Sequence, residues 1–458
     1  MTMSSTIQLP PTALGLFKAS DIAPGSIEKC NELLNVNHQK YHIYFQDPAF
    51  HNHMAYSLLT NLALCATPEE LDDRFNDLVP IQRGIPDIDQ ALLRDFADPE
   101  VFYDTIGQIH QYHTFLAFFA EEISAKGWKA VVQEYLFSHT KLADRMLAQL
   151  LEGAYHPLIH LGFGVEFEQP AIVAEALAQA ASHDRMDIED LFFEAETLAA
   201  VDVNAHRTGK PKPLVELLSE VRANETSRNG PRWSHLGAKM KIGVIVRAGQ
   251  ALAQIASQFV IRENDRKDLE RRTAEMVSVY AYLVGSVLRS DRKRKLDFFI
   301  MHAVTSSIFC TVLIRQDWIK LEDRRRLVEW KGRLDLAWYA AEGCPPLADT
   351  AISSYTGNSE LDWARIFSAA RKECDDGHVS KFVRALKNGE DTAKPYENGK
   401  WSNYFPMKGD MWIKLARICL DTTAVCPGKS SGCGSLDSMR PGNVQTFKFS
   451  IKHFINYD

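Results

Sequence analysis

The chain of 458 residues lacks the patterns that mark several common classes of protein. Its eight cysteines form no CxxC pair, which argues against a disulfide framework and favours a reducing compartment. No apolar run reaches the ~18–20 residues that a membrane span needs, because His302 and several hydroxyl residues interrupt residues 298–314. The first residues lack the charged and apolar regions of a signal peptide. We therefore expect a soluble cytoplasmic protein with no membrane partner.

Charge of one sign is not in large excess either, since the net charge is −7 and the isoelectric point is near 6.1. Nucleic-acid binding usually needs a basic face, so we expect no nucleic-acid partner. Nucleotide-binding loops are missing: GFGVEF has Phe167 where a dinucleotide loop needs glycine, and Gly428-Lys429-Ser430 has Thr423 where a P-loop needs glycine. Neither a GxSxG nor an HExxH motif occurs.

Strand-like alternation is scarce before residues 446–455, whereas apolar residues at three- and four-residue steps are frequent. This spacing predicts helices over 139–153, 171–182, 272–290 and 362–373. We therefore predict an all-α fold, a large multi-helix array that forms one catalytic domain over residues 1–425. Residues 426–458 contain helix breakers and are predicted to form a flexible joint and a short irregular or strand-like tail.

Histidine is the residue type whose placement points to chemistry. Six histidines lie in four segments with helical spacing: His51 and His53, His156 and His160, His302, and His378. Each alone is explained by a helix cap or by a core imidazole bonded to a carbonyl. Together they would bury several polar rings, at roughly 1–3 kcal/mol for every unsatisfied group. A shared metal explains them economically, because neutral imidazole binds iron, copper and zinc.

The strings FHNHMAYSLL, GAYHPLIHLGFGVEF, DFFIMHAVTSSIF and DDGHVSKFVRAL resemble, in this order, the signature blocks of the questin oxidase-like family. The resemblance runs from about residue 45 to about residue 420. It implies an oxidoreductase that opens the central ring of an anthraquinone to a benzophenone-type product in aromatic polyketide biosynthesis. It also implies a non-haem iron dioxygenase with Fe(II) held by four histidines and a carboxylated lysine, with O₂ as co-substrate. The step is also described as an NADPH-dependent Baeyer–Villiger oxidation, with NADPH used directly or through a partner reductase.

Carried over block by block, the resemblance implies one iron ligand from His51 or His53 and one from His156 or His160. The expected metal ligands are His53, His160, His302, His378 and Lys381, the last as a carbamate formed with CO₂. The candidates for other roles in catalysis are Lys381, His51, His156 and Tyr155, and those for orienting a ligand imidazole are Glu166 and Asp297. Tyr155, Phe163, Trp363 and Trp412 are candidates to line an aromatic substrate pocket. Tyr56 and Ser57 stand where many relatives have further histidines, which puts the substrate preference in doubt.

Two other functions compete with the oxygenase. A metal-dependent hydrolase can also use buried histidines and a carbamylated lysine, but it needs bridging carboxylates that the sequence does not offer. A helical scaffold without catalysis is the third interpretation. The metal content separates them, because about one iron, two zinc ions or no metal per chain is expected for oxygenase, hydrolase and scaffold.

Overall fold

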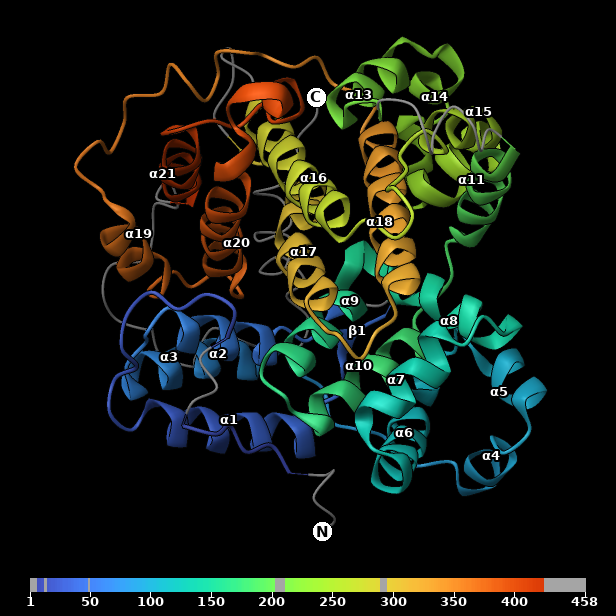
Figure 1. The fold of residues 1–458 in the computed structure, drawn as a ribbon. Coiled ribbons are helices and arrows are strands. Elements are labelled where there is room, and N and C mark those ends of the chain that lie inside the picture. Colours follow the sequence, from blue (N-terminus) through green and yellow to red (C-terminus); the bar gives the residue numbers. More distant parts are fainter. Residues whose placement is uncertain (1–5, 12–14, 48–49, 202–210, 289–294, 424–458) are drawn as a thin grey trace.

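Helices make up nearly all of the regular structure in the computed structural model, which describes residues 6–11, 15–47, 50–201, 211–288 and 295–423 (Figure 1). The N-terminal part contains a two-stranded hairpin and ten helices of the α type: α1 (Ser26–Lys40), β1 (Tyr44–Gln46), β2 (Phe50–His51), α2 (Met54–Ala63), α3 (Pro68–Leu78), α4 (Gln90–Asp95), α5 (Pro99–Thr105), α6 (Tyr112–Lys126), α7 (Trp128–Phe137), α8 (Lys141–Leu150), α9 (Glu152–Glu166) and α10 (Pro170–Ser182). The prediction of an all-α fold is confirmed.

The remaining described residues continue the array: α11 (Glu189–Val201), α13 (Leu214–Ala223), α14 (Glu225–Asn229), the π-helix η5 (Lys239–Val246), α15 (Arg247–Ala256), α16 (Arg266–Ser286), α17 (Phe298–Ile314), α18 (Leu321–Ala341), α19 (Trp363–Ala370), α20 (His378–Ala393) and α21 (Met411–Thr423). Short 3₁₀ turns connect them at 79–81, 109–111, 233–238, 394–396 and 399–404.

The centre of the array is formed by helices that are far apart in the sequence. α17 packs against α9, α16, α18 and α20, and α9 also packs against α10 and α2. Figure 1 shows α17 and α9 between the N-terminal helices and the C-terminal helices. α17 is apolar on all sides, which suits a helix that is surrounded by others, and its residues from Ile300 onwards are buried.

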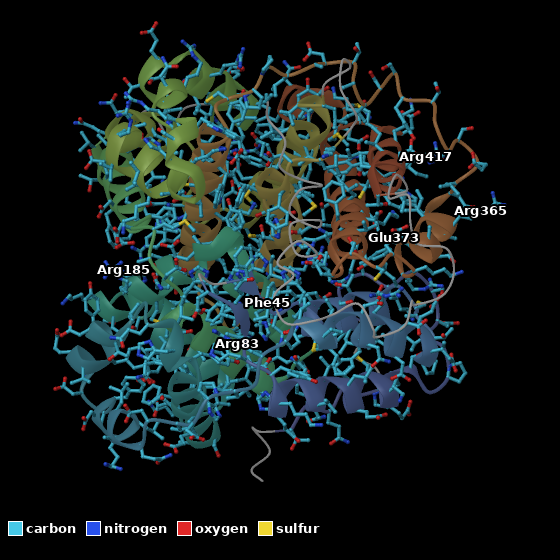
Figure 2. The ribbon with its side chains drawn as sticks, turned by 180° about the vertical axis from the view of Figure 1, so that it is seen from behind. Phe45, Arg83, Arg185, Arg365, Glu373 and Arg417 are labelled. Carbon is cyan, nitrogen blue, oxygen red and sulfur yellow. The ribbon has the colours of Figure 1, made fainter. Side chains whose placement is uncertain are left out.

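The hairpin carries the first predicted histidine into this centre. β1 and β2 pair antiparallel, with Tyr44 opposite His51, and His53 is the residue that precedes α2. The view from behind in Figure 2 labels Phe45 of β1 and Arg83, and the Arg83 guanidinium lies 3.2 Å from the carboxylate of Asp47, the residue after β1. Side chains fill the space between the helices in this view.

The predicted helices are present, and three of the four end earlier than predicted. The segment 139–153 forms α8 up to Leu150, 171–182 forms α10, 272–290 lies in α16 up to Ser286, and 362–373 forms α19. Their caps follow the sequence, since Pro170 opens α10 and the side chain of Thr140 accepts a hydrogen bond at the start of α8. The predicted joint and tail at 426–458 lie outside the described residues.

Candidate functional site

Five histidines from distant parts of the chain form one buried group at the centre of the array. They are His51 of β2, His53 before α2, His156 of α9, His302 of α17 and His378 of α20, and we call them the histidine cluster. The rings of His51 and His156 stack with centroids 3.7 Å apart, and neighbouring pairs in the rest of the cluster have centroids 4.7–5.0 Å apart. The sequence therefore predicted correctly that four segments bring imidazoles together.

The hydrogen bonds of three cluster rings fix which nitrogen faces inward. His156 donates from Nδ1 to Gly153 O at 2.5 Å, and His302 donates from Nδ1 to Phe298 O at 2.6 Å. His378 contacts the Asp376 carboxylate through Nδ1. A neutral imidazole that donates from Nδ1 carries a lone pair on Nε2. The Nε2 lone pairs of His156 and His302 are therefore available to a ligand.

The Nε2 atoms face one another across the cluster. The distance between them is 2.9 Å for His53 and His156, and 3.3 Å for His302 and His378. Because His302 and His378 both donate from Nδ1, their facing Nε2 atoms present lone pair to lone pair, which is unfavourable unless a cation or a proton lies between them. This arrangement fits a metal ion held by neutral imidazoles.

Burial keeps four of the five cluster rings neutral. For His53, burial together with the nearby Lys381 charge, and against the opposing effect of Asp376, lowers the pKa to about 3. Burial also lowers the pKa of His51, His156 and His302 well below the usual value, with a smaller contribution from neighbouring histidines. Neutral imidazole is the form that binds a metal, so these rings can serve as metal ligands.

Lys381 lies one helical turn after His378 on α20 and is buried beside the cluster. Its Nζ has no hydrogen-bond partner among the described residues and lies 5.2 Å from the centroid of the Tyr56 ring. Burial lowers the pKa of Lys381 from 10.5 to about 8, although Asp376 and Asp375 oppose the shift. A buried amine without a partner is costly as a cation, so this nitrogen is available for a further bond.

A left-handed turn aims His156 at the cluster. Gly153, Ala154 and Tyr155 have φ values of 54°, 52° and 67°, so α9 begins with three left-handed residues before the regular helix. Such a conformation costs roughly 1–2 kcal/mol for each residue other than glycine. The turn places the Gly153 carbonyl where it accepts the His156 Nδ1 hydrogen. Strain of this kind is typical of functional sites.

His183, in the loop after α10, contacts His51 of the histidine cluster, and no sequence motif marked it as a site residue. Its Nε2 lies 3.0 Å from His51 Nε2, and its Nδ1 donates to Asp184 O at 2.8 Å. A Cβ at Gly153 would lie 2.1 Å from His183 Nε2, so only glycine leaves room for this ring. The sequence placed Gly153 only at the end of the predicted helix 139–153.

Asp376 is the carboxylate nearest to the cluster. Its Oδ2 lies 3.3 Å from His53 Nδ1, and one ligand atom from each of His53, Asp376 and His378 lies within 4.8 Å of the other two. Burial alone would raise the pKa of Asp376, but its electrostatic interactions with His378 and His53 hold it well below its usual value. The residue therefore stays ionised and orients two rings, the role that the sequence analysis assigned to Glu166 and Asp297.

His160 is the predicted metal ligand that the structure places elsewhere. Its Nε2 lies 2.7 Å from Glu175 Oε2, and the other oxygen of Glu175 lies 2.7 Å from His38 Nδ1. Within the 156/160 pair, the structure thus brings His156 into the cluster and not His160. The physical reason is the left-handed turn, which turns His156 inward, whereas His160 lies one regular turn further along α9 and meets α10.

The other three side-chain candidates are held by other partners. Tyr155 donates its hydroxyl hydrogen to Asp335 at 2.6 Å, Glu166 forms an ion pair with Arg384, and Asp297 caps α17 by accepting from Ile300 N at 2.8 Å. The cluster rings instead donate to Gly153 O, Phe298 O and Asp376. Backbone carbonyls as acceptors leave no mark in a sequence, which explains why they were not predicted.

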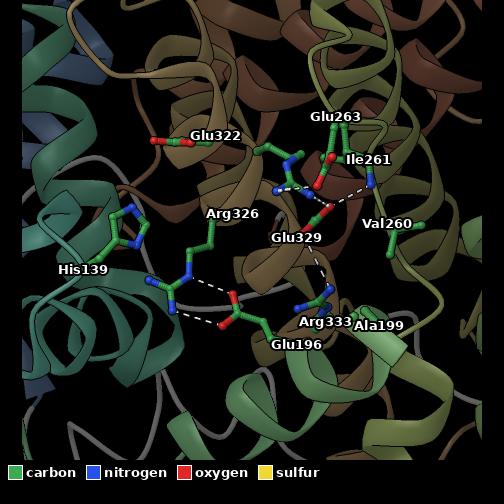
Figure 3. Close-up of a pocket in the computed structure, with 12 residues that line it drawn as sticks. His139, Glu196, Ala199, Val260, Ile261, Glu263, Glu322, Arg326, Glu329 and Arg333 are labelled. Carbon is green, nitrogen blue, oxygen red and sulfur yellow. Dashed lines mark hydrogen bonds and ion pairs between the residues drawn. The ribbon is translucent and has the colours of Figure 1, made fainter. Parts of the chain in front are cut away.

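A cavity of about 520 Å³ lies between α11, α18 and the loop at 260–263, away from the cluster (Figure 3). Charged side chains dominate its lining, and Figure 3 shows them largely paired, with Arg326 against Glu196 at 2.7 Å. None of the four aromatic residues predicted to line a substrate pocket lines this cavity. It does not have the apolar character expected for a flat polycyclic substrate.

Among the residues that the structure describes, no helix is both long enough and apolar enough to cross a lipid bilayer.

The family model described as questin oxidase-like matches residues 50–386. The chain belongs to the questin oxidase-like family. It is 55% identical over 426 residues to the Baeyer-Villiger monooxygenase dmxR6 of Cryptosporiopsis sp., covering 93% of this chain and 95% of the relative. It is 51% identical to the Baeyer-Villiger oxidase AgnL3 of Paecilomyces divaricatus, covering 92% and 91%. It is 42% identical to a questin oxidase of Aspergillus fumigatus, covering 93% and 95%.

Membership of the questin oxidase-like family decides among the three competing classes. The similar proteins are named oxidases or monooxygenases, so the chain is an oxidoreductase, and the hydrolase and scaffold interpretations are set aside. The matched span contains the whole histidine cluster and Lys381. The predicted resemblance to the questin oxidase-like family is confirmed, whereas the ligand roles of single residues stay predictions.

Proposed function

We propose that this protein is an iron-dependent oxygenase that inserts oxygen beside a carbonyl of an anthraquinone and so opens the central ring to a benzophenone. The name questin oxidase and the name Baeyer-Villiger oxidase, carried by proteins similar to this chain, support this reaction class. The observation that carries the metal is the set of neutral imidazoles whose Nε2 lone pairs face one another, with the unpartnered amine of Lys381 beside them. His51, His53, His156, His302 and His378 are the available imidazoles, and Lys381 offers the further ligand.

Iron bound there would supply the activation of O₂ for attack on an electron-rich carbon. His53, His156 and His302 stay neutral through burial and keep their lone pairs for the ion. Gly153 O, Phe298 O and Asp376 hold the ring orientations from behind, so the ligands do not need to be reorganised. The burial of the cluster excludes water, which strengthens the electrostatic interactions inside it.

We propose that Lys381 acts as a carbamate. Its neutral Nζ attacks CO₂, a C–N bond forms, one proton leaves, and the amine becomes an anionic oxygen ligand. The lowered pKa of Lys381, about 8, supports this step because only the neutral amine adds to CO₂. An anion there offsets the charge of a cation that is otherwise held by neutral rings.

The electrons balance in two ways that an isotope experiment separates. If NADPH, directly or through a reductase, supplies two electrons, one atom of O₂ enters an ester, the other leaves as water, and hydrolysis of the ester opens the ring. If the substrate enters as the reduced hydroquinone, both atoms of O₂ enter the ring-opened acid and no external reductant is needed in the oxygenation step. With ¹⁸O₂, the first course gives a product with one labelled oxygen and the second gives two.

The decisive experiment measures metal, oxygen and product together on the purified full chain. We expect about one iron per chain and turnover in air, with NADPH present or with the anthraquinone reduced beforehand to its hydroquinone, and no turnover under argon. Iron removal by a chelator should abolish turnover, and Fe(II) but not Zn(II) should restore it. Turnover that persists without O₂, or a fully active protein without metal, would reject the proposal.

The carbamate has its own measurement. Protein equilibrated with ¹³C-bicarbonate should give a carbamate carbon signal in the NMR spectrum. This signal should be absent from the Lys381→Ala variant and present in Lys387→Ala, whose lysine lies on the same helix but pairs with Glu390 at 2.8 Å. The same signal in both variants would place the carbamate elsewhere.

A further inference from the structure

A buried ion pair on α18 lies directly behind the histidine cluster. Lys331 and Asp335 stand one helical turn apart, and both side chains have no exposed surface. The Lys331 Nζ donates to both oxygens of Asp335, at 2.8 Å and 2.6 Å. Replacing such a pair with apolar residues is often neutral or stabilising, so stability alone does not explain its presence.

The remaining hydrogen bonds of this pair reach the backbone neighbours of two cluster residues. Lys331 Nζ also donates to the carbonyl of Ala303, the residue after His302, at 2.7 Å. Asp335 accepts at 2.6 Å from the hydroxyl of Tyr155, the residue before His156. The rings of His156 and His302 have centroids 4.9 Å apart. One ion pair thus connects the two segments that carry adjacent rings of the cluster.

Tyr155 needs an anchor because of its backbone. Its φ of 67° lies in the left-handed region, which residues with a side chain rarely adopt. Persistence of such a conformation requires that the surroundings hold it. The hydroxyl bond to Asp335 is a polar tie that holds the last residue of the left-handed turn, and that turn directs His156 inward.

We propose that Lys331, Asp335 and Tyr155 act together as a positioning device, which we call the α18 clamp. The α18 clamp fixes the left-handed turn of α9 and sets the spacing between His156 and His302, so that both Nε2 atoms face the same point. Its effect on metal binding rests on the proposed function, whereas its effect on the turn does not.

The test compares two variants, each of which lacks one hydroxyl group in the same buried region. Tyr155→Phe removes the donor to Asp335. Tyr280→Phe is the matched control, because the Tyr280 ring lies 5.5 Å from Lys331 Nζ but its hydroxyl has no hydrogen-bond partner among the described residues. Both variants are made in the full chain, and circular dichroism checks that each keeps its helix content.

Two readouts are measured on protein freed of metal. In hydrogen exchange, we expect faster exchange at residues 152–156 in Tyr155→Phe and no change there in Tyr280→Phe. In a titration with Co²⁺, followed by its visible absorption, we expect 10–100-fold weaker binding for Tyr155→Phe, the usual loss when an outer partner of a metal ligand is removed. Equal exchange in the two variants would overturn the α18 clamp.

The two readouts separate the clamp from the proposed function. If the unaltered protein binds no Co²⁺, the metal site fails, and the exchange readout still decides whether the clamp holds the turn. A double variant, Lys331→Met with Asp335→Leu, removes both α18 residues of the clamp and leaves no unpaired charge. Adding Tyr155→Phe to it should not weaken Co²⁺ binding further, because the partner of the hydroxyl is already gone. An additive loss would mean that Tyr155 acts independently of Asp335.

Discussion

His156 and His160 stand four residues apart on one helix, yet the structure gives them different partners. The Nε2 of His156 faces His53 at 2.9 Å, whereas the Nε2 of His160 lies 2.7 Å from Glu175. At the scale of single residues, this difference makes a matched pair of variants possible on α9.

We expect His156→Ala to lose iron and His160→Ala to keep it. A ligand loss should weaken metal binding by more than the 10–100-fold typical of an outer partner. His160→Ala leaves the buried Glu175 with one partner fewer, so it should lower the free energy of unfolding by about 1–3 kcal/mol with iron still bound. Iron analysis and urea unfolding of both variants check this. If His160→Ala loses iron while His156→Ala retains it, the ligand belongs to position 160.

Lys381 offers a second test at the residue scale. Lys381→Ala should remove the proposed anionic ligand and leave a space beside the cluster. Turnover should fall strongly and recover in part when formate or acetate is added, because a small carboxylate can occupy that space. Lys387→Ala on the same helix is the control and should keep full turnover without any response to carboxylate. Unimpaired turnover of Lys381→Ala would remove the carbamate from the mechanism.

At the scale of elements, the left-handed turn at the start of α9 is the feature that the sequence concealed. The pattern of apolar residues predicts the helices well, because burial decides it. One face is apolar in α8, and all faces are apolar in α17. This pattern does not predict three consecutive left-handed residues, since two of them, Ala154 and Tyr155, favour the right-handed form. The sequence therefore does not state that His156, and not His160, lies in the histidine cluster. His183 was missed because it stands outside every motif.

The left-handed turn of α9 should tolerate no side chain at Gly153. Gly153→Ala introduces a Cβ that would lie 2.1 Å from His183 Nε2, in addition to the cost of a side chain at φ 54°. Gly409→Ala is the control, because Gly409 has φ 53° and nothing within 4 Å of the added atom. We expect Gly409→Ala to cost about 1 kcal/mol of unfolding free energy and Gly153→Ala about 2–4 kcal/mol.

The additional loss of stability in Gly153→Ala should become smaller when the neighbouring His183 ring is removed. Adding His183→Ala to Gly153→Ala should recover part of the lost stability, although His183→Ala alone removes a buried ring and is destabilising. Thermal or urea unfolding of the four proteins measures the coupling. Strictly additive losses would show that the added methyl group and the His183 ring do not compete for the same space.

At the scale of the whole molecule, residues from separate segments determine both the cluster and its surroundings. Composition and periodicity predicted an all-helical chain with buried histidines, but no local pattern states which helices meet. The contacts of α17 with α9 and α20 join residues more than 60 positions apart, as does the contact of His302 with His378. The resemblance to the family indicated that the four segments belong to one site. The distances between the rings came only from the structure.

Glu175 connects three helices through its carboxylate, a set of contacts that we call the Glu175 tie. Its protonation should change the free energy of unfolding. Glu175 lies on α10. Its Oε2 lies 2.7 Å from His160 Nε2 of α9, and its Oε1 lies 2.7 Å from His38 Nδ1 of α1. Burial alone would raise the pKa of Glu175, but the hydrogen bonds and charges of these two histidines outweigh it and lower the pKa from 4.5 to about 2. The pKa of His38 is raised above 6.5, because its bond to Glu175 outweighs its burial.

These shifts fix the sign of the pH dependence. A carboxyl group with a lowered pKa stabilises the fold above its unfolded value, near 4.5, and this contribution is lost as the pH falls towards 2. A histidine with a raised pKa stabilises the fold below 6.5, and that contribution is lost as the pH rises through its higher folded value. The contribution of the Glu175 tie should therefore be greatest between about pH 4.5 and pH 6.5.

We expect Glu175→Gln to be less stable than the unaltered chain by about 2–3 kcal/mol in that window, with a smaller difference on both sides of it. Urea unfolding at pH 4, 5.5 and 8 measures the difference. Glu100→Gln is the control, since the Glu100 side chain is 75% exposed, lies 3.6 Å from Lys141, and should contribute less than about 1 kcal/mol. A stability difference for Glu175→Gln that does not change with pH would show that the carboxylate is not held ionised by the two histidines, and that α1, α9 and α10 are joined by packing alone.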